Sequence, residues 1–235
     1  MKNISKNTKK FNILSSVKES TPVNGVKLLS VKTGLSDGII LHGSFLGGSI
    51  FNKNNPVLPR FVASMISEGT VRHSKEIIRE KIEDLGAQIN FSSDSYRVYF
   101  SISVLKKDVS KIISILAEEL REPALTKDTL NLLCTKEITN LSHLREDTRV
   151  NAYRILCRNI FSKYHPNYTY TIDESIKFIE KLSLSEIVLF YKKVYGVGSI
   201  VIVATGDIDH SIIEKEIIKN FKGWKNSNIA SLPVV

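Results

Sequence analysis

Hydrophobic and polar residues alternate along several short stretches of the chain, as they do in β-strands with one buried face. The longest stretch, residues 89–104, is rich in aromatic and β-branched residues and predicts a long strand or a hairpin. In residues 38–51 the pattern is interrupted by Gly47 and Gly48, where we expect a bend or bulge. Two further strands are predicted for residues 26–33 and 199–208.

Elsewhere hydrophobic residues recur every three or four positions, which indicates amphipathic helices. Ile78, Ile82 and Leu85 share one face of a helix that begins after the N-cap Ser74 and stops at Gly86. Further helices are predicted for residues 58–69, 108–120, 126–161, 183–196 and 210–222, the third range holding two helices broken near Glu146 and Asp147. Early strands followed by mixed helices and strands indicate an α+β fold, an antiparallel sheet covered by helices.

The chain has 235 residues, 42% of them hydrophobic and 24% charged, which is the composition of a globular domain and excludes disordered and collagen-like classes. We expect one domain over residues 20–224. Residues 1–19 are basic and polar and are interpreted as a tail, because they carry no hydrophobic signal segment and no arginine. The polar, proline-bearing residues 225–235 are interpreted as a linker or chain end.

The formal net charge is +9, but the lysines are spread along the chain and do not alternate with aromatic residues. We therefore expect a solvated basic surface and no nucleic-acid partner. Because no apolar run approaches the length of a bilayer, we expect a soluble protein without a membrane span. Cys134 and Cys157 fall in helical patterns without a metal spacing and are interpreted as free thiols. This favours the cytoplasm, with the periplasm or an organelle as alternatives.

Five stretches, in order, resemble one half of a pitrilysin/insulinase-type zinc peptidase, the inverzincin family that includes mitochondrial processing peptidases and respiratory-complex core subunits. They are "NGVKLLSV", "MISEGTVRHSKEIIREKIEDLGAQINFSS", "LREPALTKD", "HPNYTYTIDESIKFIEKLSLSEIVLFYKKVYG" and "VIVATGDID". The resemblance runs from Thr21 to Trp224. It implies a helix-covered antiparallel sheet, two such halves facing each other around a peptide.

The family binds zinc through a His-x-x-Glu-His helix and a downstream glutamate. By resemblance the first histidine falls on Arg60, the catalytic glutamate on Ala63 and the second histidine on Ser64. Arg60 is permanently cationic, Ala63 has no lone pair and a serine hydroxyl is a poor zinc ligand. We therefore expect no catalytic residue, no metal site and no cofactor in this chain, zinc being held by a partner half.

Glu137 falls near the position of the third ligand. We interpret it as a solvated glutamate on a helix surface, with a remnant of that ligand as the alternative. His143, Glu146 and Asp147 have a metal-like spacing but are interpreted as a solvated helix end. The other histidines, which stand apart in the sequence, are predicted to be surface or core residues: His42, His73, His165 and His210.

Catalytic halves of the family add the substrate peptide as an extra strand beside an Asn-Ala-x-Thr-like segment, which needs only an exposed sheet edge. The corresponding residues here are Asn90, Phe91, Ser92 and Ser93. They are the candidate peptide-binding edge. Phe91 stands where alanine is usual, and we expect it to crowd that edge. An ordinary sheet edge closed by its own side chains is the alternative.

The sequence thus predicts a non-catalytic domain that pairs with a zinc-bearing catalytic half to form a chamber for degrading or processing unstructured peptides. One alternative is an active metalloendopeptidase that uses an unrecognised site. Another is a structural core subunit of a larger assembly. Nucleic-acid binding through the net charge has the weakest support.

Overall fold

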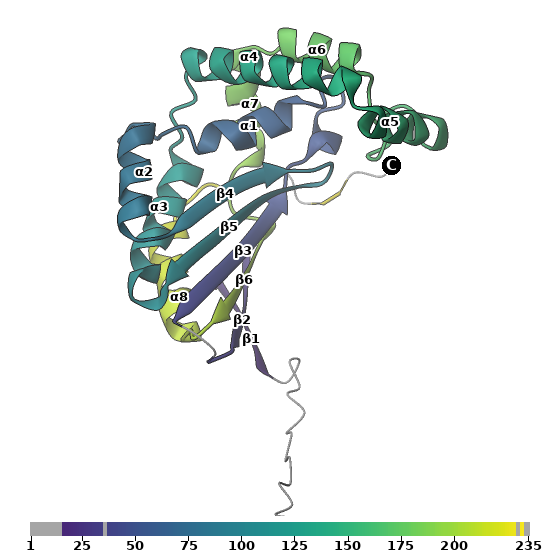
Figure 1. Ribbon diagram of the computed structural model, residues 1–235. Coiled ribbons are helices and arrows are strands. Elements are labelled where there is room, and N and C mark those ends of the chain that lie inside the picture. The colour runs from purple at the N-terminus through teal and green to yellow at the C-terminus, as the bar shows by residue number, and fades with distance from the viewer. Residues whose placement is uncertain (1–15, 35–36, 229–230, 233–235) are drawn as a thin grey trace, which may run out of the picture.

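A six-stranded sheet forms the centre of the molecule, and a computed structural model describes residues 16–34, 37–228 and 231–232 of the chain. The strands lie in the order β1-β2-β6-β3-β5-β4 (Figure 1). Their bounds are Val17–Val23 (β1), Val26–Lys32 (β2), Gly38–Leu46 (β3), Gln88–Ser93 (β4), Arg97–Leu105 (β5) and Ile200–Gly206 (β6). The pair β2–β6 is parallel and the other neighbours are antiparallel, which corrects the expected all-antiparallel sheet. A parallel partner is accessible to β6 because the helices before it provide the long crossover connection.

Eight α-helices and three short 3₁₀ turns accompany this sheet in the described part of the chain. The helices are Leu58–Ile66 (α1), Lys75–Asp84 (α2), Val109–Arg121 (α3), Lys127–His143 (α4), Thr148–Ile160 (α5), Ile172–Glu180 (α6), Leu184–Val194 (α7) and His210–Phe221 (α8). The turns are Ser49–Phe51 (η2), Lys106–Asp108 (η3) and Leu144–Glu146 (η4). The break predicted near Glu146 and Asp147 is confirmed, because α4 ends just before η4 and Asp147 caps α5.

Most predicted elements are present, and residues 89–104 form a hairpin, β4–β5, which was one of the two predicted forms. Three differences remain. The chain after Gly47 and Gly48 turns into η2 instead of continuing as a strand. Helix α6 and strand β1 were not predicted. Because β1 starts at Val17, the end of the predicted tail belongs to the sheet. Residues 1–15 of that tail lie outside the described residues.

The two faces of the sheet have different surroundings. One face is covered, with α3 packing beside β5, α8 beside β1 and α1 beside β4 (Figure 1). On this side Gly43 lies directly under the ring of Phe100, and a Cβ there would come within 1.9 Å of a ring carbon, so only glycine fits. The opposite face is accessible, and Ile40, Tyr99 and Val203 are 46%, 37% and 36% exposed on it.

The residues that follow Trp224 continue along the domain. The amide of Ser227 donates to the carbonyl of Val197 at 2.7 Å, and that of Asn228 donates to the carbonyl of Lys193 at 3.0 Å. Gly196 makes room for this segment, because a Cβ there would come within 2.4 Å of the Lys225 carbonyl oxygen. The first residues of the predicted linker are therefore bound to the folded domain. Residues 229–230 and 233–235 lie outside the described residues.

Candidate functional site

Helix α1 carries the three positions that the resemblance assigns to the zinc motif. Pro59 is the second residue of α1 and lies in the first turn, where its missing amide hydrogen costs no hydrogen bond. Ala63 is 1% exposed and belongs to the hydrophobic core. Arg60 and Ser64, one turn apart, lie on a more accessible face of the helix. The structure therefore places Ala63 in the core and leaves Arg60 and Ser64 on the less buried face of α1.

Helix α4 brings Glu137 to this face of α1. The guanidinium Nη2 of Arg60 donates to the Oε1 of Glu137 at 2.6 Å, across 77 residues of sequence. The side chain of Glu137 is 22% exposed and that of Arg60 is 50% exposed. Glu137 thus lies on the surface of its helix, as interpreted, but its carboxylate is only partly solvated and is paired with a cation. The packing of α4 on α1 places its carboxylate against the motif helix.

These residues do not fit a zinc ion. The carboxylate that the metal would need is bound to a permanent cation, and neither Ala63 nor Ser64 supplies a good ligand. Across the described ranges, His, Cys, Asp and Glu nowhere gather in a group of three or more that could hold a metal. His143 and Glu146 are exposed at the end of α4 and in η4, and Asp147 accepts from the amide of Val150, as expected of a helix end. No chemical step through a metal is derived for this chain.

A cavity of about 840 Å³ opens beside the Arg60–Glu137 pair. It lies between α1, α4, α5 and the residues that precede α6. Arg149 and Arg154 from α5 line it together with the rings of Tyr153 and Tyr170. This volume is in the range of pockets that hold organic ligands. The arginines of α5 were not among the predicted site residues, because only the tertiary packing places them beside α1.

The candidate peptide-binding residues lie on β4, the last strand of the sheet at that edge. Phe91 pairs with Phe100, and its side chain packs against the hydrophobic core on the helix-covered face. It therefore points away from the open edge that it was expected to crowd. Asn90 and Ser92 are exposed and border a depression of about 400 Å³ on the accessible face. Ser93 lies two residues after Phe91 on the same strand, so its side chain points to the same face of the sheet. Peptide binding at this edge stays a prediction.

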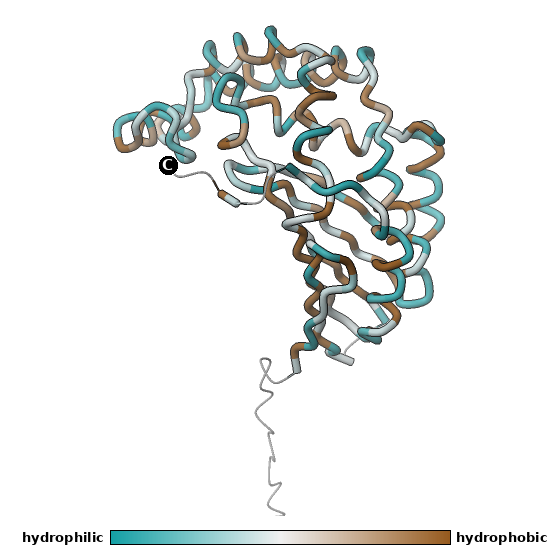
Figure 2. The backbone as a smooth tube through the Cα atoms, turned by 180° about the vertical axis from the view of Figure 1, so that it is seen from behind, coloured by the Kyte–Doolittle hydropathy of each residue, from teal (hydrophilic) through white to brown (hydrophobic). Residues whose placement is uncertain are grey.

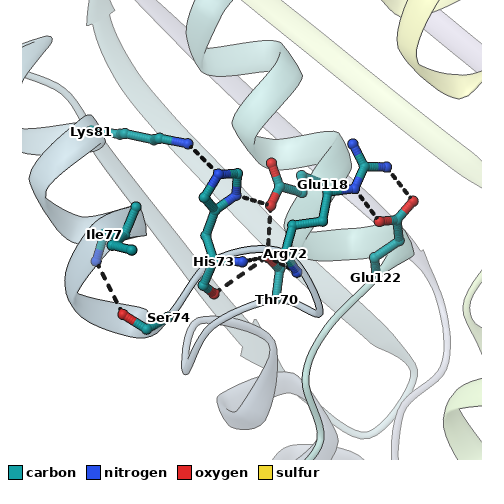
Figure 3. A network of polar contacts seen from close by, with 8 residues as sticks. All are labelled: Thr70, Arg72, His73, Ser74, Ile77, Lys81, Glu118 and Glu122. Atoms are coloured by element: carbon teal, nitrogen blue, oxygen red, sulfur yellow. Dashed lines mark hydrogen bonds and ion pairs between the residues drawn. The ribbon is translucent and has the colours of Figure 1, made fainter.

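A polar network, separate from the cavity, joins the α1–α2 loop to α3 (Figure 3). Thr70 donates to the Oε1 of Glu118 at 2.6 Å, and the Nδ1 of His73 lies 2.7 Å from the same oxygen. Because the ammonium of Lys81 donates to the Nε2 of His73 at 2.8 Å, the ring proton is on Nδ1 and is donated to Glu118. Burial raises the pKa of Glu118, but the hydrogen bonds from His73 and Thr70 outweigh it and hold the pKa below its ordinary value.

The network has a structural role. The hydroxyl of Thr70 also accepts from the backbone amides of Arg72 and His73 at 3.2 and 3.0 Å, which leaves it no lone pair for a substrate. Arg72 forms a two-point hydrogen bond with Glu122 at 2.7 and 2.6 Å (Figure 3). Every ring nitrogen of His73 has a partner. These contacts fix the loop between α1 and α2 to α3.

Glu119, the neighbour of Glu118 on α3, lies on the buried side of that helix. It is 1% exposed, and its Oε2 has no hydrogen-bond partner. Burial, with the adjacent Glu118 charge, raises the pKa of Glu119 to about 8. It borders a cavity of about 430 Å³ between α1, α2 and β4. Glu119 is thus mainly protonated at neutral pH, and no sequence pattern marked it as unusual.

Comparison with known proteins finds similarity to the family that the sequence motifs resemble. Residues 46–155 match the model of the family described as insulinase (peptidase family M16). The mitochondrial-processing peptidase subunit beta of Caenorhabditis elegans is 24% identical over 212 residues, which are 89% of this chain and 45% of that protein. The non-peptidase homolog YmxG of Helicobacter pylori is 24% identical over 163 residues, which are 69% of this chain and 37% of that protein.

The fold is also found among solved structures. A peptidase M16 inactive domain from Pseudomonas fluorescens superposes with a TM-score of 0.82 at 20% identity, over 92% of this chain and 53% of that one. This likeness establishes the α+β fold. The chain spans about half, or less, of the length of each of these relatives.

No helix within the described ranges is both long enough and apolar enough to cross a bilayer.

Proposed function

Because residues 46–155 match the insulinase (peptidase family M16) model and a processing-peptidase subunit aligns with 89% of the chain, we propose that this chain is a non-catalytic half that pairs with a zinc-bearing catalytic half around unstructured peptides. In this role it contributes one wall of a chamber in which the partner hydrolyses the peptide. In this proposal the partner, and not this chain, activates the water.

The observation that carries this proposal is the Arg60–Glu137 ion pair. In a catalytic half the motif helix and the downstream glutamate would hold a metal between them. Here a guanidinium lies 2.6 Å from that glutamate, so the two helices keep their contact through an ion pair. A half whose partner performs the chemistry can lose its metal site and still keep its fold.

The relatives support the same role. One of them is named a non-peptidase homolog and another an inactive domain, and the chain spans only part of each. If a second half pairs with this domain, the surface that it covers is accessible when the domain is alone. We infer that this surface includes the accessible sheet face and α5.

Exposed apolar side chains support this assignment of the surface. Helix α5 projects from the rest of the domain and contains hydrophobic residues along its length (Figures 1 and 2). Ile155, Leu156 and Ile160 are 51%, 55% and 62% exposed on it. Apolar groups gathered in this way at the surface of a domain are typical of contacts with another protein. The proposed occupant is a catalytic half that carries His-x-x-Glu-His.

The experiment is co-purification from the native source, followed by a cleavage assay with unstructured peptides. The chain alone, the catalytic half alone and their mixture are compared. We expect a specific complex, cleavage by the mixture and none by this chain alone. Ser64→Ala in this chain, at a partly exposed motif position, should leave the activity of the pair nearly unchanged, whereas loss of the partner's zinc ligands should abolish it.

Two results would overturn the proposal. If the chain migrates as a monomer with no family-related partner, or if adding it leaves the partner's activity unaltered, the structural-subunit alternative takes its place. If the chain cleaves peptides alone, the alternative of an unrecognised active site is correct.

A further inference from the structure

Arg154 is a partly buried cation whose charge is not matched by a carboxylate. It lies on α5 and lines the cavity of about 840 Å³. Its Nη1 donates to the backbone carbonyl of Tyr170 at 2.7 Å, and in the part of the chain that the structure describes no ion pair involves its guanidinium. A half-buried guanidinium with one neutral partner retains donors for an anion.

The other charged groups of the cavity leave Arg154 unneutralised. Arg60, Arg149 and Arg154 line it against two carboxylates, Glu137 and Asp147. The first carboxylate is bound to Arg60, and the second accepts from a backbone amide at the start of α5. Burial, and then repulsion from Arg158 and Arg60, lower the pKa of Arg154 below its ordinary value, and attraction by Glu137 offsets this only in part. An anion in the cavity would relieve that repulsion.

The walls of the cavity restrict which anion fits best. Beside the cations they present the side chains of Leu141 and Val150 and the rings of Tyr153 and Tyr170. A volume of about 840 Å³ greatly exceeds that of a single inorganic anion. The preferred ligand therefore carries a carboxylate next to an apolar group. The last residue of a peptide has both, on one Cα atom.

We propose that the cavity beside Arg154 binds the C-terminal carboxylate of an unstructured peptide, with the apolar side chain of the last residue against the tyrosine and leucine walls. The position that holds a metal in catalytic members would thus serve here as an anchor for a peptide end. This inference rests on the proposed function only in taking a peptide as the ligand. Binding by the isolated chain tests it without the partner.

The experiment is equilibrium binding by titration calorimetry with the full chain alone. The probes are an unstructured peptide ending in leucine, the same peptide amidated at its C-terminus, an amidated peptide with an internal aspartate, and inorganic phosphate. A charge-assisted hydrogen bond contributes about 1.5–3 kcal/mol, so we expect the free carboxylate to bind about ten- to a hundredfold more tightly than the amide. The two other probes should bind no better than the amide.

Two variants with opposite expected effects sharpen the test. Arg154→Met keeps the apolar stem and should weaken binding about tenfold or more. Glu137→Gln frees Arg60 for the ligand and should tighten it. Arg79→Met is the matched control, because Arg79 is exposed on α2, pairs with Glu83 and lies away from the cavity. Thermal unfolding of each variant verifies that it is folded.

Several outcomes would overturn the inference. Equal binding of the acid and the amide excludes a carboxylate site, and equal binding of phosphate identifies an unspecific anion site. Equal binding of the internal aspartate peptide assigns the site to acidic side chains. Weaker binding by Glu137→Gln contradicts the role of Arg60. If the peptide end binds but no catalytic half pairs with the chain, the proposed function fails and this inference stands.

Discussion

Arg60 places a fixed positive charge at the position where the resemblance would put the first zinc ligand. Its guanidinium binds Glu137, the carboxylate that a metal would need, at 2.6 Å. Both side chains reach solvent, so the pair contributes only about 0–1 kcal/mol to stability. Its consequence is chemical, because the cation and the metal would compete for the same carboxylate.

This competition leads to a prediction about metal content. We expect the protein purified without chelator to carry far less than one zinc per chain by elemental analysis. Arg60→His combined with Ser64→His should restore two imidazoles beside Glu137 and allow zinc to bind. Adding Glu137→Gln to that variant should weaken the binding again. About one tightly held zinc in the natural chain, or zinc binding by the variant that ignores Glu137, would contradict this account.

Glu119 makes the stability of the protein depend on pH. The pKa of Glu119 is about 8 in the folded chain, and its ordinary value, taken for the unfolded chain, is 4.5. Between these two pH values the folded state holds a proton that the unfolded state releases. The stabilisation is complete below about pH 4.5 and is lost as the pH rises toward about 8. Each unit of difference corresponds to about 1.4 kcal/mol, so the total is a few kcal/mol.

Glu119→Gln removes this titration. We expect its free energy of unfolding, relative to the natural chain, to rise by a few kcal/mol between pH 5 and pH 8. Glu83→Gln is the control, because the side chain of Glu83 is 66% exposed on α2. Urea unfolding across this pH range is the measurement. If the curves for the natural chain and Glu119→Gln run parallel, Glu119 does not titrate as described.

At the scale of elements, the α1–α2 loop is held to α3 by hydrogen bonds of side chains. Thr70 is 5% exposed. Its hydroxyl donates a hydrogen bond to Glu118 and accepts one from each of two backbone amides. Valine has nearly the same shape but no oxygen, so Thr70→Val leaves buried donors unpaired. We expect a loss of about 1–3 kcal/mol in the free energy of unfolding, measured by urea denaturation.

Thr139→Val is the matched control for this change. Thr139 is exposed on α4, and its hydroxyl donates to the carbonyl of Thr135 one turn earlier. Its substitution should alter stability by no more than about 0.5 kcal/mol. Equal effects of the two substitutions would mean that the network does not stabilise the loop.

At the scale of the whole molecule, the net charge of +9 is spread over many elements. Part of it is neutralised locally, for example where Lys106 donates to Asp207 at 2.6 Å and Lys75 to Glu68 at 2.7 Å. We expect only weak, sequence-independent association with DNA or RNA, falling steeply with salt as counterions are released. Fluorescence anisotropy with a duplex and a single strand measures it. Submicromolar binding at physiological salt would show that the charge forms a specific site.

Local patterns were sufficient for most elements. The alternation in residues 89–104 and the apolar stripe of α3 were read correctly, because each element buries one face and local periodicity records which face that is. Two elements were missed although local signals exist. The Asn24–Gly25 turn marks the hairpin that contains β1, and Thr171 with Glu174 forms a capping box at the start of α6.

The sequence alone determined the α+β class and the family resemblance, and it predicts the loss of the metal motif at Arg60, Ala63 and Ser64, because these depend on residue types and their spacing. Only the tertiary structure decided which distant residues meet. In the structure β2 pairs with β6, and the side chain of Phe91 packs against the core. Arg60 binds Glu137, and Arg154 lines the cavity beside this ion pair. Contacts between helices 77 residues apart depend on packing angles and burial, which no short stretch of sequence encodes.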